Sequence, residues 1–200
     1  SRINNSMASE LFVDKITGKT GTAGSAPLSM SGNTLTATLG TSSTGFGLIT
    51  HMDQWRVTTT TGGGSAVLTS NLERVDTDWS GIGTGMTESS GIFTFPVTGI
   101  WLVNVDASFY SASGAAAYQG IYTQLDDDGT GYSNRAINLC NVTGTSYYSA
   151  MSTSIALDIE NTSTHSVRFY MASSGNSDMR AIGNTDATQT GFTFIRLGDT

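Results

Sequence analysis

The sequence predicts an all-β protein, an antiparallel jelly-roll sandwich preceded by an extended N-terminal arm. The composition is one indication, because Gly, Thr and Ser are abundant and charged residues make up only 12% of the chain. Threonine suits a pleated surface and glycine suits turns. The second indication is a period of two in apolar residues along most segments after residue 50. No segment has the period or the helix formers of a convincing helix.

Residues 1–50 are rich in Gly, Ser and Thr and contain few apolar residues. Two short strand-like pieces occur there, Leu11–Ile16 and Thr34–Leu39, and in the second the apolar residues alternate with threonines. Both pieces are too short to bury a core alone. They favour an arm that becomes ordered on a partner, and a flexible tail is the alternative. We therefore predict two parts, an attachment arm over 1–50 and a head over 51–200.

The head begins with two strand segments, QWRVTTT at 54–60 and AVLTSNLERV at 66–75, on either side of a glycine turn at 62–64. The segment GIFTFPVTGIWLVNVDASFY at 91–110 follows. It combines a proline and a glycine with the most hydrophobic stretch of the chain, which a buried helix would not tolerate. Two strands joined by a corner explain both residues, with Pro96 ending the first strand and Gly99 supplying the turn.

The strand after this corner has a clear inner face. Trp101, Val103, Val105, Ala107 and Phe109 share one side of it, and polar residues share the other. This alternation is typical of a half-buried strand.

The remaining segments repeat the pattern. GIYTQL at 120–125 ends in an acidic turn, and GFTFIRL at 191–197 places Phe192 and Phe194 on one face. Residues 152–171 contain two alternating runs around the turn ENTSTH, which predicts a hairpin. We expect about eight strands after His51, an arrangement typical of a sandwich or jelly roll.

The charge of the chain limits its partners. The formal net charge is −7, with nine scattered Lys and Arg residues. Nucleic acids and anionic membranes bind clustered basic residues, so neither is expected as a partner. No apolar run approaches the roughly 20 residues that span a bilayer.

Few residues suggest chemistry. Cys140 is expected to be a small buried apolar residue, and His51 and His165 have no metal-ligand spacing. We find no nucleophile–base pair, and therefore expect neither an enzyme nor a cofactor.

Two loops leave alternatives open. Asp126–Asp128 form either a solvated hairpin turn or a weak cation site. Tyr147 and Tyr148 either bind a sugar or a protein partner, or pack in a core or against a subunit.

The corner segment resembles the signature of the complement globular-head family of TNF-like jelly rolls. Phe93, Pro96, Val97, Gly99 and Trp101 fall on its positions, and the resemblance extends over about residues 54–199. The upstream part departs from the signature. Val75 and Gly81 stand where it has Phe and Asn or Asp, and Phe95 stands where Cys is common.

This resemblance implies a homotrimer whose strand faces pack around a threefold axis. It also indicates which residues form the fold signature and pack in the core or the trimer. These residues are Phe93, Pro96, Gly99, Trp101, Val103, Val105, Phe169, Phe192 and Phe194.

The N-terminal segment LFVDKITGKTGT resembles the amino-terminal segments of phage virion proteins. This implies a virion structural protein, either a capsid decoration or cement protein anchored by its arm, or a tail-fibre tip that binds a host receptor or glycan. The expected partners are further copies of the chain, capsid or tail proteins and, for a fibre tip, a host surface glycan or protein.

Overall fold

The computed structural model describes residues 28–31, 34–37, 49–79, 81–174 and 178–200. The chain divides into two units, Ser1–Phe46 and Gly47–Thr200, which are described separately. The boundary expected at residue 50 stays a prediction.

In the first unit, β1 (Leu28–Ser31) pairs with β2 (Thr34–Ala37) as a short antiparallel ladder. The strand predicted at Thr34–Leu39 is thus present over Thr34–Ala37. The piece predicted at Leu11–Ile16 lies outside the described residues.

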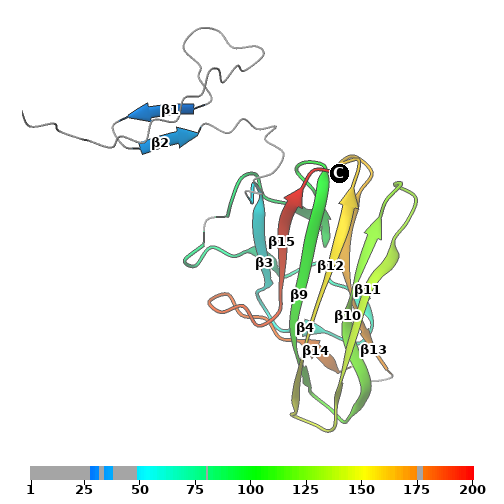
Figure 1. Cartoon of the computed structure of the whole chain (residues 1–200). Coiled ribbons are helices and arrows are strands. Elements are labelled where there is room, and N and C mark those ends of the chain that lie inside the picture. The colour runs from blue at the N-terminus through cyan, green and yellow to red at the C-terminus, as the bar shows by residue number, and fades with distance from the viewer. Residues whose placement is uncertain (1–27, 32–33, 38–48, 80, 175–177) are drawn as a thin grey trace, which may run out of the picture. The chain divides into compact units, whose positions relative to one another are not determined.

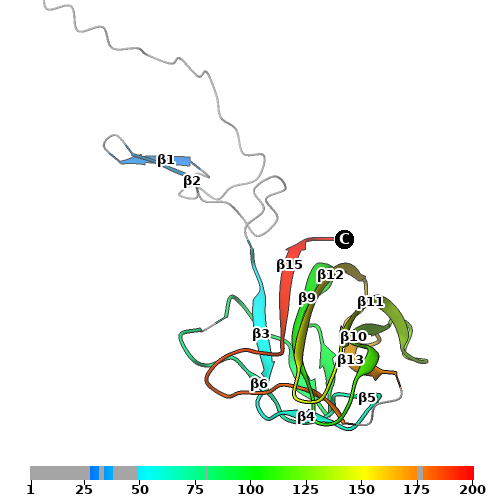
Figure 2. The ribbon, with the colours of Figure 1, turned by 90° about the horizontal axis from the view of Figure 1, so that it is seen from below.

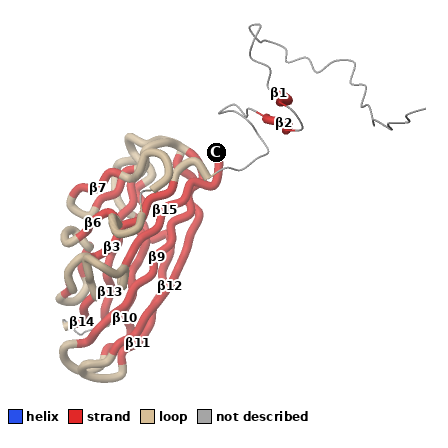
Figure 3. The backbone as a smooth tube through the Cα atoms, turned by 90° about the vertical axis from the view of Figure 1, so that its left-hand side faces the viewer, coloured by secondary structure: helices blue, strands red, loops and turns tan. Residues whose placement is uncertain are grey.

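The described part of the second unit, which we call the head, is all-β and contains no helix (Figure 3). Its strands are β3 (Met52–Val57), β4 (Thr61–Gly62), β5 (Ala66–Val67), β6 (Leu72–Arg74), β7 (Thr87–Ser89), β8 (Ile92–Thr94), β9 (Gly99–Ser111), β10 (Ala116–Asp126), β11 (Ser133–Val142), β12 (Tyr148–Ile159), β13 (Ser166–Ser173), β14 (Met179–Ala181) and β15 (Gly191–Gly198). These 13 described strands exceed the eight expected, because several have only two or three residues and show no alternation that a sequence pattern can detect.

The strands form two antiparallel sheets (Figure 1). The β10 sheet has the order β11-β10-β13-β8-β7, and β5 also pairs with β13. The β9 sheet has the order β4-β14-β9-β15-β3-β6. β14 and β15 pair with successive parts of one edge of β9, and β12 pairs with its other edge. In the view of Figure 2, β3, β15, β9 and β12 form one layer, and β11, β10 and β13 form the layer facing it.

The hairpin predicted over 152–171 is wrong. β12 pairs with β9 over twelve registered residue pairs, whereas β13 pairs with β10, β8 and β5 in the other sheet. The turn at 160–165 therefore links the two sheets. Alternation correctly places Ile155, Leu157 and Ile159 on the inward side, but it cannot say which strand lies alongside.

One half of the interior, between β3, β15, β8 and β13, is filled by rings, and we call it the aromatic half. Phe93 lies against Trp55, Phe169, Phe192 and Phe194 at centroid distances of 5.3, 5.5, 6.1 and 5.4 Å. Phe169 and Phe192 stack at 3.8 Å. Such ring pairs add specific geometry to the burial of a large apolar area.

The other half of the interior, beneath β10, β11 and β12, contains polar groups, and we call it the polar half. Gln119 is fully buried, and its Nε2 donates to Ser149 Oγ at 2.6 Å. Cys140 Sγ lies 3.1 Å from the Oγ of Ser149. The sequence predicts a buried cysteine, and the structure shows it half-buried. Within the described residues, Gln119 Oε1 and the hydroxyl of Thr123 have no hydrogen-bond partner.

Two charged residues of β3 are also buried. Asp53 accepts hydrogen bonds from Trp55 Nε1 at 2.8 Å, Met86 N at 2.8 Å and Arg74 Nε at 2.9 Å. Arg56 pairs with Glu73 and Asp76, each at 2.7 Å. Because buried charges need such partners, these contacts fasten β6 and the residue Asp76 just after it to β3.

Candidate functional site

The signature residues lie at the corner and in the core. Phe93, Trp101, Val103, Val105, Phe169, Phe192 and Phe194 are all buried members of one core cluster. Pro96 is half-buried in the turn after β8. Gly99 begins β9 at a φ of +134°, and a Cβ there would lie 2.4 Å from the Gly198 carbonyl oxygen. The corner therefore requires glycine at this position. A role of these residues in trimer packing stays a proposal.

The outer face of the β9 sheet has an apolar row near the start of β9. Met52, Ile195, Leu102 and Ala156 are consecutive cross-strand neighbours on β3, β15, β9 and β12. The first three are half-buried, and Ala156 is exposed. The outward positions of β12 between Tyr148 and Asp158 are all Ala or Ser, so this part of the face is flat.

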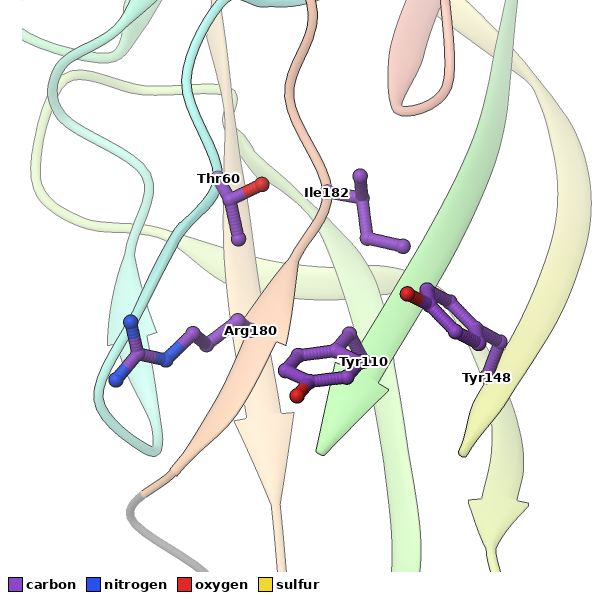
Figure 4. Close-up of a pocket in the computed structure, with 5 residues that line it drawn as sticks. All are labelled: Thr60, Tyr110, Tyr148, Arg180 and Ile182. Atoms are coloured by element: carbon purple, nitrogen blue, oxygen red, sulfur yellow. The ribbon is translucent and has the colours of Figure 1, made fainter. Parts of the chain in front are cut away.

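A second row crosses the same face near the end of β9. Arg180 of β14 is the register partner of Tyr110 of β9, which is in turn the partner of Tyr148 of β12. The two tyrosine rings are 5.2 Å apart at an angle of 45°, and Tyr148 is 71% exposed. Thr60 and Ile182 complete a hollow of about 260 Å³ (Figure 4).

This hollow continues into another one of about 470 Å³. Tyr148 and Ile182 line both, and Ser108, Ser149, Ala150 and Gln189 line the second. We call the two together the tyrosine groove. Its wall is aromatic at one end and carries hydroxyl and amide groups at the other, and such a mixture is typical of sites that orient small polar ligands.

Arg180 is the basic residue of the groove. Residues 51–200 contain six arginines and no lysine, against 14 Asp and Glu residues, giving a net charge of −8 (6 − 14). Arg56, Arg74, Arg135 and Arg196 form ion pairs, and Arg168 donates to Gln124 and lies over the Tyr132 ring. Among the described residues, no hydrogen bond or ion pair engages the exposed guanidinium of Arg180.

The β10 sheet also exposes apolar side chains. Ile137 and Leu139 of β11 are 53% and 42% exposed, beside Tyr122 and Gly120 of β10 in the register. Tyr122 in turn lies 6.0 Å from Tyr170. This patch, which we call the β11 patch, is on the opposite sheet from the tyrosine groove.

The acidic turn uses its carboxylates internally. Asp126 Oδ1 accepts hydrogen bonds from the amides of Asp128, Gly129 and Gly131, and Asp127 pairs with Arg135. Hydrogen bonds from the side chain and then the amide of Thr130 lower the pKa of Asp128. In the part of the chain that the structure describes, no three His, Cys, Asp or Glu side chains form a group that could hold a metal ion.

Sequence reasoning singled out Tyr148, which lines the groove, and Tyr147, which is exposed but does not line it. It missed Thr60, Tyr110, Arg180 and Ile182. These residues come from three separate segments. The pairing of β4 with β14, and of β14 and β12 with β9, brings them together with Tyr148. The described residues also include no helix of the length and hydrophobicity needed to cross a membrane.

The sequence matches no protein-family model and no curated protein. Solved structures do match. The crystal structure of murine APRIL at pH 8.5 has a TM-score of 0.52 and 11% identity, over 74% of this chain and 98% of that chain. Eiger TNF from S. frugiperda has a TM-score of 0.51 and 12% identity, over 74% of this chain and 93% of that chain.

The PRD1 vertex protein P5 matches with a TM-score of 0.40 and 13% identity, over 76% of this chain and all of that chain, a score that supports no inference. The matches to APRIL and Eiger agree with the two-sheet sandwich seen in this chain. The head therefore has the TNF-like jelly-roll fold.

Proposed function

We propose that this chain is a structural protein of a bacteriophage virion. It forms a homotrimer through its head and is anchored to the capsid, as a decoration or cement protein, by residues 1–50. The trimer is proposed because one head presents two unlike apolar surfaces. They are the apolar row of the β9 sheet and the β11 patch. The virion location rests on the resemblance of the N-terminal segment to phage proteins.

A threefold rotation brings a different surface of each subunit against its neighbour, so a closed trimer needs two complementary patches. The apolar row ends on a flat part of the face, because Ala156 and the other outward residues of β12 between Tyr148 and Asp158 are small. The β11 patch projects Ile137 and Leu139 beyond its sheet. A flat row and a projecting pair can pack together and remove both from water, which contributes roughly 25 cal/mol for each Å² of apolar surface buried.

Light scattering coupled to gel filtration tests the trimer. We expect three times the mass of the 20.9 kDa chain. Leu102→Lys and Ile137→Lys should each give monomers, because each places a charge in one of the two patches. Ser133→Lys, at an exposed polar position of β11, is the matched control and should stay trimeric. A folded wild-type monomer at working concentration would contradict the proposal.

The anchor is tested by deletion of residues 1–50. The remaining head contains the whole core cluster, so it should stay folded and trimeric but no longer join particles. A truncated head that still attaches to capsids would exclude the arm as the anchor. Immunogold labelling of intact particles would show whether the chain lies on the capsid or the tail.

The second candidate is the tip of a tail fibre or other appendage that recognises a host receptor or glycan. The observation in its favour is the tyrosine groove, which is open and lined by aromatic and hydroxyl groups. In both cases the role is binding and assembly, and we propose no catalytic activity.

A further inference from the structure

We propose that the tyrosine groove binds a saccharide that carries a carboxylate, such as a uronic or sialic acid unit. This inference concerns the head alone and holds whether the chain belongs to a capsid, a tail or neither. Three features of the groove support it: the two tyrosine rings, the guanidinium of Arg180, which no described residue engages, and the hydroxyl and amide groups beyond them.

The tyrosines supply the stacking surface. Tyr110 and Tyr148 present two neighbouring rings at 5.2 Å, and the Tyr148 ring is largely in solvent. The C–H face of a pyranose ring packs against such rings because it is apolar, while the phenol hydroxyls remain at the rim as polar groups. Tyr147 is also exposed but lies outside the groove, so the stacking surface is a feature of the β9–β12 register.

Arg180 supplies the charge recognition. It stands beside Tyr110 in the register, on the side away from Tyr148 (Figure 4). A guanidinium binds a carboxylate through two parallel hydrogen bonds, which fixes both position and orientation. Figure 4 shows the Arg180 side chain directed away from Tyr110, so a carboxylate held by its guanidinium would lie at one end of a ligand whose further rings cover the tyrosines. Since the head is otherwise acidic, this local cation acts as a selective site rather than as part of a general attraction for anions.

The second hollow supplies hydrogen bonds. Ser108 and Gln189 offer a hydroxyl and an amide there, and Thr60 offers a hydroxyl beside Arg180. The hydroxyl groups of a saccharide need such donors and acceptors when they leave water.

An extended peptide is a weaker fit. It would bind most readily by adding a strand at an open sheet edge. At Tyr110, however, β9 is already paired with β14 on one side and β12 on the other, so its backbone groups are taken. Recognition at this row depends on side chains, and the side chains present suit a ring with hydroxyl groups and a carboxylate.

The test is calorimetric titration of the full-length chain with pairs of saccharides that differ in charge. Tetragalacturonate and its methyl ester form one pair, and 3′-sialyllactose and lactose form a second. A glucuronate-containing tetrasaccharide and the same tetrasaccharide with its carboxyl groups reduced to alcohols form the third. We expect at least one acidic member to bind and its neutral partner to bind about tenfold more weakly, a difference of about 1.4 kcal/mol.

Variants then locate the site. Arg180→Gln should remove the preference for the acidic member, and Tyr148→Ala should weaken both members about tenfold. Tyr147→Ala is the matched control, since it removes an exposed tyrosine one residue away, and its affinity should stay within about twofold of wild type. Circular dichroism and light scattering of each variant confirm that fold and oligomeric state are unchanged.

Three results would overturn the proposal. One is the absence of binding by every acidic member at millimolar concentration. Another is an equal loss in Tyr147→Ala and Tyr148→Ala. The third is a change of oligomeric state in Tyr148→Ala, which would make the groove a contact between copies of the chain. None of these results bears on whether the chain is found in virions.

Discussion

The aromatic and polar halves of the interior differ in how they hold the two sheets together. In the aromatic half, rings from β3, β8, β13 and β15 interlock, and Phe169 stacks on Phe192 across the two sheets. In the polar half, Gln119 reaches Ser149 through a single 2.6 Å hydrogen bond, and two buried polar atoms lack partners within the described residues. Apolar burial is the larger stabilising contribution, so we expect the aromatic half to determine the stability of the head.

Removing a ring from the aromatic half should cause the largest loss of stability. Phe192→Ala empties a fully buried position between Phe93 and Phe169, which should cost about 3–5 kcal/mol of the free energy of unfolding. Urea denaturation followed by fluorescence measures it. Met151 of β12 is a buried residue of the polar half, where its sulfur accepts a hydrogen bond from the amide of Ile121 in β10. Met151→Ala is the comparison, and a loss of stability as large as that of Phe192→Ala would contradict the division.

The second-largest loss of stability is expected at the corner that links β8 to β9. Gly99→Ala forces a side chain into a positive-φ position and within 2.4 Å of a carbonyl oxygen, which should cost about 2 kcal/mol. Gly131→Ala is the control, because nothing lies within 4 Å of its Cβ. If thermal melts showed equal changes for the two variants, the corner would not depend on glycine.

In the polar half, a substitution should be able to stabilise the protein. Thr123→Val replaces a buried hydroxyl that has no partner among the described residues by a methyl group of similar size, and it should raise stability by about 1 kcal/mol. Thr123→Ser keeps the hydroxyl, removes a methyl group and should destabilise. A melting temperature of Thr123→Val below that of wild type would show that the hydroxyl is needed.

The smallest effect concerns pH. Burial, with a smaller contribution from the positive charge of Arg196, lowers the pKa of His51 from its usual 6.5. The folded state therefore disfavours the protonated ring, and the stability linked to His51 is present above pH 6.5 and is lost as pH falls through the lowered pKa. His51→Asn should flatten the dependence of the melting temperature on pH below 6.5. An unchanged slope would exclude this linkage.

The strands with a regular pattern and the corner between β8 and β9 could be predicted from the sequence. Alternation identifies β9 and β15 and places Trp101, Val103, Val105, Phe192 and Phe194 in the core. One face of β9 is buried along its length, and β15 buries its inward residues Phe192 and Phe194. The Pro96–Gly99 corner is equally clear, since both residue types have narrow conformational uses.

Which strands pair with one another could not be predicted from the alternation of side chains. The segments 152–159 and 166–171 have the pattern of a hairpin, yet their strands belong to different sheets, because side-chain periodicity carries no information about the neighbouring strand. The buried charges of Asp53 and Arg56 also escaped prediction, since their partners Arg74, Glu73 and Asp76 lie in a segment without alternation. The tyrosine groove depends on the same long-range pairings.

The position of β3 has a mechanical consequence. It is the strand that follows the N-terminal segment, and five registered pairs join it to β15 while three more join it to β6. A pull on the chain ahead of Ile49 would load these ladders along the strand axis, so that their hydrogen bonds resist together instead of opening one after another. A head pulled by its leading segment would therefore resist with both ladders at once.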